Sequence, residues 1–187
     1  MSGGDFCSAL PERLFEMTNS VMTGCEVNAI AAAILYREAR LLDHGEWSEW
    51  VAMYREDAVY WVPAWLDEYQ TTSDPATQVS LVYHDQRRGL EERIARIESR
   101  KSITALPLPR TVHQVSNLEA EETEPGRIFC HSVFSVHVYD PRVAKEHVRH
   151  GRYQHTLIRD GADWKIARKI ITLVNDRVPA VLDFYSI

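Results

Sequence analysis

The spacing of hydrophobic residues changes from a helical to a strand-like period about halfway along this chain. Between Thr23 and Gly45 the apolar residues recur every three or four positions, which places them on one face of an α-helix. Thr23 and Glu26 have the Thr-x-x-Glu spacing of a capping box, so the helix is predicted to begin there. Gly45 stands where a left-handed glycine commonly ends a helix.

One charged residue, Glu38, falls near the middle of the apolar face of this predicted helix. A buried carboxylate is unfavourable unless it is paired or hydrogen-bonded, so Glu38 needs a partner. Its role stays open between a structural ion pair and a general base in a cavity. We predict that the partner is Arg168, because Arg168 interrupts an apolar strand face just as Glu38 interrupts an apolar helix face.

The segment after the helix carries the aromatic residues that could form a subunit contact. A short amphipathic stretch, 46–54, leads into a predicted strand over 60–65, which contains Trp61, Pro63 and Trp65. Pro63 removes a backbone donor, which suits a strand end or a sheet edge. We expect this strand to form the first edge of the curved sheet. Aromatic residues are enriched at interfaces, so these three residues are the predicted contact patch, with a place in the core as the alternative.

The second half of the chain alternates polar and apolar residues with a period of two, which is typical of strands. Strands are predicted over 110–121, 128–138, 146–159 and 164–174, after a shorter strand over 78–83 and a helix over 86–99. Asp160-Gly161 is a strong hairpin signal between the last two long strands. Helices followed by antiparallel strands predict an α+β fold, with the helices on one face of a bent, mostly antiparallel sheet.

Length and composition indicate one domain of ordinary globular type. The chain has 187 residues, and we assign 23–187 to one α+β domain and 1–22 to an arm with a short helix over 11–21. The net charge of −6 argues against a nucleic-acid surface. No apolar run is long enough to span a membrane. Three widely spaced cysteines favour reduced thiols, and hence a cytoplasmic location.

The histidines His147, His150 and His155 form the tightest group of candidate metal ligands. They fall on a predicted strand, where His147 and His155 share one face about 26 Å apart and His150 points the other way. The ring nitrogens of all three histidines can bind one metal ion only if the strand breaks sharply between them. Gly151 is a weak candidate for that break. We therefore expect neither a metal nor a cofactor in this chain. No phosphate-binding, dinucleotide-binding or nucleophile-elbow motif is present.

Four separated motifs together resemble one protein family. In chain order they are YREARLLDHGEWSEWVAMYREDAVYWVPAW, YHDQRRGLEERIARI, PRTVHQVSN and DWKIARKIITL. They resemble the small (β) subunit of aromatic-ring-hydroxylating dioxygenases over residues 27–187. The stretch WVPAW, with TSDP and VSLVY after it, is most similar to the branch that acts on benzoate, halobenzoates and anthranilate. The arm before Val27 is longer than is usual in the family.

The resemblance implies a cone-like fold of the nuclear-transport-factor-2 or cystatin type, with helices on the concave face of the sheet. It also implies a non-catalytic small subunit in an α3β3 hexamer. The large α subunit of that complex holds a Rieske [2Fe-2S] cluster and a mononuclear Fe(II). NADH supplies electrons through a reductase, and O2 converts the aromatic substrate to a cis-dihydrodiol. The small subunit is expected to form a trimer that supports assembly.

A stand-alone dehydratase or isomerase on the same cone fold is the alternative function. It would use Glu38 or His113 as a general base inside the cone. The contents of the cone discriminate between the two functions. Bulky apolar side chains indicate a scaffold, whereas an open pocket that holds a carboxylate and a histidine indicates an enzyme.

Overall fold

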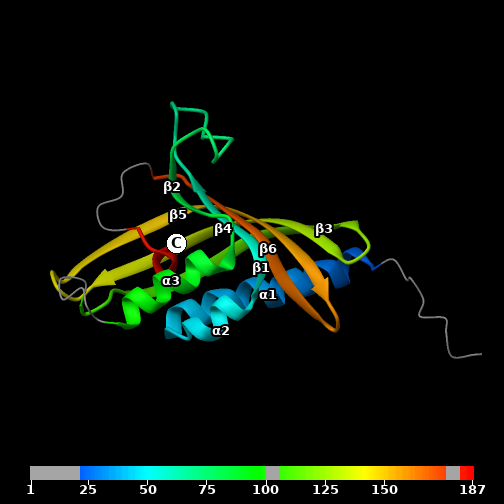
Figure 1. The fold of residues 1–187 in the computed structure, drawn as a ribbon, viewed down its shortest axis with the longest axis horizontal. Coiled ribbons are helices and arrows are strands. Elements are labelled where there is room, and N and C mark those ends of the chain that lie inside the picture. The colour runs from blue at the N-terminus through cyan, green and yellow to red at the C-terminus, as the bar shows by residue number, and fades with distance from the viewer. Residues whose placement is uncertain (1–21, 100–105, 176–181) are drawn as a thin grey trace, which may run out of the picture.

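Six strands form one strongly curved, open sheet in the order β2-β1-β6-β5-β4-β3 (Figure 1). The computed structural model describes residues 22–99, 106–175 and 182–187. The strands are β1 (Tyr54–Pro63), β2 (Ser80–His84), β3 (Arg110–Glu124), β4 (Arg127–Asp140), β5 (Lys145–Asp160) and β6 (Asp163–Leu173). The helices described are α1 (Gly24–His44), α2 (Trp47–Ala52), α3 (Arg87–Glu98) and the short 3-10 helix η2 (Phe184–Ser186). The predicted α+β class is confirmed.

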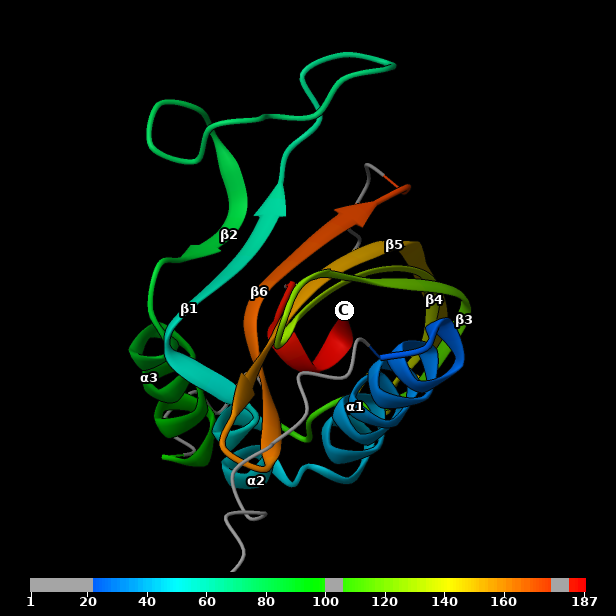
Figure 2. The same ribbon diagram turned by 90° about the vertical axis from the view of Figure 1, so that its right-hand side faces the viewer.

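The helices lie on the concave face of the sheet, and none of those described covers the convex face (Figure 2). The longest, α1, begins as predicted: the Glu26 carboxylate accepts from the Thr23 backbone at 2.8 Å, and Thr23 Oγ1 accepts from the Glu26 backbone at 3.3 Å. Gly45 ends it at φ +70°, a left-handed conformation that glycine adopts without steric cost. The residues of α1 that face the sheet are buried, and Glu38 is one of them.

The sheet is mixed, because β1 runs parallel to β6 while every other neighbouring pair is antiparallel. The sequence pattern placed β1 at the first edge. In the structure β2 pairs outside β1 and takes the edge position, so that expectation is wrong. Pro63 is the last residue of β1, beside a register shift, which agrees with the strand-end position predicted from its missing donor.

Strand β5 passes through Gly151 without a break. A Cβ atom at this position would lie 2.0 Å from the Thr172 carbonyl oxygen and 3.0 Å from the Phe134 ring. The Phe134 ring in turn stacks on Tyr153, with centroids 4.0 Å apart. Gly151 therefore serves close packing between strands, and it does not provide the strand break considered from the histidine spacing.

The last described segment, 182–187, fills the middle of the concave face (Figure 2). Phe184 is buried and stacks on Trp50, with ring centroids 4.7 Å apart at an interplanar angle of 15°. Arg93 pairs with Asp183 at 3.0 Å, and Arg149 donates to the carbonyl and hydroxyl oxygens of Ser186. Apolar burial and two arginines thus hold the segment against the helices and the sheet.

The predicted arm lies outside the described residues except for Met22, so the short helix over 11–21 stays a prediction. Among the described helices, none combines the length and the hydropathy that a membrane crossing requires.

Gly151→Ala should destabilise the fold, because the added methyl group overlaps a backbone carbonyl that cannot move without breaking the β5–β6 pairing. We expect a loss of about 1–3 kcal/mol in the free energy of unfolding, measured by urea denaturation. Gly24→Ala is the control, since nothing lies within 4 Å of the added atom. Equal stability of the Gly151→Ala variant and the parent would contradict the close-packing role.

Candidate functional site

A buried group of polar side chains meets at Glu38 on the concave face. The Glu38 carboxylate accepts hydrogen bonds from Lys169 Nζ at 2.8 Å, from the Tyr54 hydroxyl, and from His155 Nε2 at 3.2 Å. The side chains of Glu38, Lys169 and His155 are 3%, 1% and 0% exposed. These four residues, named below as the Glu38 cluster, connect α1 to β1, β5 and β6.

The charges within the Glu38 cluster compensate one another. Burial alone would raise the pKa of the Glu38 carboxyl, but the Lys169 ammonium and the His155 hydrogen bond outweigh it and hold that pKa far below its ordinary value. Burial lowers the pKa of His155, which favours the neutral imidazole. The Lys169 ammonium also lies 4.3 Å from the centroid of the Tyr153 ring, a cation–π contact. Burial also lowers the pKa of Lys169, and the Glu38 carboxylate opposes that shift by favouring the ammonium form.

The predicted pairing of Glu38 with Arg168 is wrong, and a β-bulge explains why. The register between β5 and β6 shifts where Thr156 pairs with Arg168 and Leu157 pairs with Ile166, which leaves Ala167 as an extra residue. Ile166 faces the core as the alternation predicts, but after the bulge the inward face passes to Lys169. Arg168 is exposed on the convex face instead.

Aromatic side chains pack around the Glu38 carboxylate, which is buried among the described residues. The Tyr54 ring packs against Trp50, with centroids 5.1 Å apart, and Trp50 stacks on Phe184. Burial raises the pKa of the Tyr54 hydroxyl well above its ordinary value, so Tyr54 stays protonated and donates to the carboxylate. The arrangement stabilises charge inside the core, and among the described residues the Glu38 carboxylate is already bonded to three side chains.

His113, the other candidate base, is held by Asp43 at the end of α1. The Asp43 carboxylate lies 2.5 Å from His113 Nδ1, and it accepts hydrogen bonds from the His113 backbone and the Thr111 hydroxyl, both at 2.9 Å. The His113 side chain is 2% exposed. Hydrogen bonds from His113 outweigh burial and lower the pKa of Asp43. This group fastens α1 to β3, and the structure keeps it apart from the Glu38 cluster: no described contact joins them.

The three histidines of β5 lie as the strand prediction requires. His147 and His155 project from one face, and His150, which is exposed, projects from the other. Among the described residues no group of three or more histidine, cysteine, aspartate or glutamate side chains is placed to hold a metal ion.

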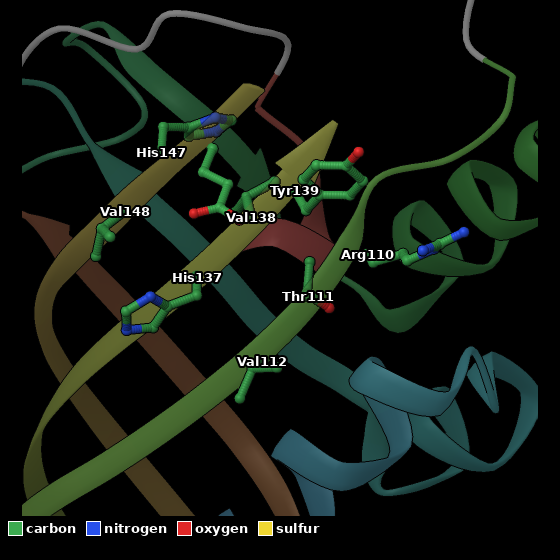
Figure 3. Close-up of a pocket in the computed structure, with 9 residues that line it drawn as sticks. Arg110, Thr111, Val112, His137, Val138, Tyr139, His147 and Val148 are labelled. Carbon is green, nitrogen blue, oxygen red and sulfur yellow. The ribbon is translucent and has the colours of Figure 1, made fainter. Parts of the chain in front are cut away.

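An open hollow of about 350 Å³ lies on the sheet where β3, β4 and β5 run side by side (Figure 3). Its lining includes Val112, His137 and Val148, together with Arg110, Glu146 and His147. Opposite charges, Arg110 and Glu146, stand in one open surface depression here, and His147, whose buried Nε2 has no hydrogen-bond partner among the described residues, also lines it. The hollow resembles a contact surface more than a catalytic pocket.

The predicted contact patch is mostly covered within a single chain. Trp61 is 4% exposed and donates from its indole to Ser80 Oγ at 2.8 Å, and Pro63 is also buried. Trp65 is half-buried, and its indole donates to the Leu173 carbonyl at 2.7 Å. Trp61 and Pro63 therefore have little surface to offer a partner, and Trp65 alone of the three keeps an accessible side.

Sequence reasoning found Glu38 but missed Tyr54, His155 and Lys169 as its partners. The sequence predicts His155 only as a candidate metal ligand, and the alternation that turns Arg168 inward implies an outward position for Lys169. One signal was available: Gly151, Tyr153 and His155 alternate on one face of the strand, and this face points into the core.

Lys169→Met should cost about 3–5 kcal/mol in the free energy of unfolding, because it leaves a buried carboxylate without its ammonium partner. Arg152→Met is the control: Arg152 lies on β5, one of the strands that supply the cluster, but its side chain is exposed, and the variant should stay within about 0.5 kcal/mol of the parent. Urea denaturation measures both. Similar losses in the two variants would contradict the assignment of Lys169 as the partner.

His155 should make stability depend on pH. Its folded pKa is lowered, so below the ordinary histidine pKa of about 6.5 the unfolded chain binds a proton that the folded chain does not. Stability should therefore fall as the pH falls through that window. His155→Gln should reduce the slope by up to about 1.4 kcal/mol per pH unit. Urea denaturation from pH 7.5 to pH 5 measures it, and equal slopes would contradict a neutral His155.

The chain is similar to known proteins over most of its length. Residues 37–180 match the protein family described as ring hydroxylating beta subunit. The beta subunit of toluate 1,2-dioxygenase from Pseudomonas putida is 39% identical over 153 residues, which are 82% of this chain and 93% of that protein.

Solved structures give the same result. The beta subunit of benzoate 1,2-dioxygenase from Burkholderia mallei has a TM-score of 0.71 and 32% identity, covering 85% of this chain and 96% of that one. A putative scytalone dehydratase from Novosphingobium aromaticivorans has a TM-score of 0.61 at 14% identity, covering 83% and 90%, and so shares the fold alone. The chain belongs to the family of ring-hydroxylating dioxygenase beta subunits.

Proposed function

We propose that this chain is a non-catalytic, structural small subunit of a multicomponent dioxygenase that cis-dihydroxylates an aromatic carboxylate. The observation that carries the proposal is that the described residues of the concave face bury Glu38 and pair it with Lys169, His155 and Tyr54. The same interior holds stacked aromatic rings, the segment 182–187 and an ion pair that neutralises itself. A subunit built in this way supports a partner through its surface, and its interior provides stability.

The substrate class follows from the family branch. The two relatives described above are named after toluate and benzoate, which are aryl carboxylates. Both relatives align with more than four-fifths of this chain. An aryl carboxylate is therefore the proposed substrate of the complex. The large α subunit would bind it, together with the Rieske [2Fe-2S] cluster and the mononuclear Fe(II). NADH would supply electrons through a reductase.

The proposed assembly is a cytoplasmic α3β3 hexamer in which three copies of this chain form one ring. The large subunit would dock on that ring, and the convex face and the sheet edges remain available for such contacts (Figure 2). Trp65 stays a proposed contact residue, because part of its side chain is accessible beside the loop 66–75.

The alternative, a stand-alone dehydratase or isomerase, is less well supported. Such an enzyme requires a base that substrate can approach. Glu38 accepts hydrogen bonds from three side chains, and His113 is 2% exposed and bonded to Asp43. The scytalone dehydratase, at 14% identity, shares only its fold with this chain.

Reconstitution tests the proposal. The purified chain alone should migrate well above its 21.5 kDa mass and should not turn over benzoate or toluate. Activity should appear when the chain is co-expressed with its large subunit and supplied with reductase, NADH and O2. The large subunit expressed without this chain is the control, and it should assemble poorly. Benzoate turnover by the chain alone, or failure to bind any large subunit, would contradict the scaffold function.

A further inference from the structure

The connection between β1 and β2, residues 64–79, projects away from the helices as an ordered loop (Figure 2). Its base is fastened by hydrogen bonds from the Thr72 backbone to the Ala64 carbonyl at 2.8 Å and from the Trp65 indole to the Leu173 carbonyl. At its tip the Asp67 carboxylate accepts from the backbone of Tyr69 and of Gln70, each at 2.8 Å. The loop thus has a defined conformation.

This loop presents an aromatic residue that has no contact within its own chain to bury it. Tyr69 is 86% exposed, and Leu66 beside it is 56% exposed. The loop contains three acidic residues and no basic ones. A tyrosine on a loop that is already ordered loses little conformational entropy when it binds a partner. Such residues are typical anchors of protein interfaces.

The convex face contains a hollow whose chemistry is complementary to this loop. It has a volume of about 250 Å³ and is lined by Phe129, Gln154, Thr156, Arg168 and Ile170, which come from three neighbouring strands. Phe129 and Ile170 provide apolar walls, and Arg168 provides a cation without an acidic residue in the lining. The volume is below the ~300–1,000 Å³ of pockets that enclose drug-sized ligands, so a single side chain suits it better.

We propose that Tyr69 of one copy inserts into this convex hollow of a second copy. The phenol ring would lie between Phe129 and Ile170 and against the Arg168 guanidinium, and the acidic loop would face the same cation. The larger hollow of Figure 3 fits less well, because its lining contains the Glu146 carboxylate as well as the Arg110 guanidinium, whereas the lining of the convex hollow has a cation and no carboxylate. The inference also gives Arg168 a role that its exposed position otherwise lacks.

The contact uses two different surfaces of the same chain, so it is heterologous. Heterologous contacts build closed rings when the rotation between copies closes, as a trimer requires. The inference rests on the proposed function in one respect, namely that this chain associates with itself within the complex.

Sedimentation velocity on the full chain tests the contact. Tyr69→Ser and Arg168→Glu should each weaken self-association at least tenfold, because one removes the anchor and the other reverses the charge that receives it. Tyr36→Ser is the matched control: Tyr36 is 54% exposed but lies on α1, and its replacement should leave self-association unchanged. Circular dichroism checks that all three variants fold.

A mixture of the two disabled variants gives the sharper result. The Arg168→Glu chain keeps an intact loop and the Tyr69→Ser chain keeps an intact hollow, so the mixture should form a one-to-one dimer that neither variant forms alone. Normal assembly of either variant alone, a mixture that stays monomeric, or a monomeric parent chain would overturn the contact.

Co-expression with the large subunit separates this proposal from the proposed function. If Tyr69→Ser associates with itself normally but no longer binds the large subunit, the loop contacts that subunit and the inference is wrong, while the scaffold function stands. If the parent chain binds no large subunit, the scaffold function itself fails.

Discussion

The buried carboxylate of Glu38 is the constraint on which the rest of the structure depends. A charge inside the core must be compensated, and here a lysine, a histidine and a tyrosine from three different strands converge on it. The cluster therefore fixes how α1 lies across the sheet. The stacked rings of Trp50 and Phe184 pack beside it, and burial in such surroundings strengthens each interaction within the group.

The two faces of the sheet have consequently separate roles. The concave face is covered by the helices and the segment 182–187, and it holds the Glu38 cluster, which contributes stability. The convex face is bare of the described helices, and it exposes valines and two hollows that side chains of a partner could fill. A family member that works through assembly needs this division, because its contacts with partners must lie outside a rigid interior.

Much of the fold could be predicted because helix capping and strand alternation are local signals. Thr23 and Gly45 marked the ends of α1, and the four long strands followed from their period of two. The partner of Glu38 could not be predicted in the same way. A single extra residue, Ala167, inverts the alternation of β6, and bulges depend on the pairing between strands. Likewise, no local pattern indicated that Phe184 would fill the cone.

The central claim is that the residues inside the cone are structural and include no catalytic group. The most direct test is to measure kcat of the assembled complex per iron. Tyr54→Phe and His155→Gln change the hydrogen-bonding groups around Glu38 while keeping similar volumes. If the cone is structural, complexes that contain either variant and remain intact by mass should have the same kcat per iron as the parent. A loss of ~10²-fold or more in an intact complex, the size expected on removing a general acid or base, would contradict the account.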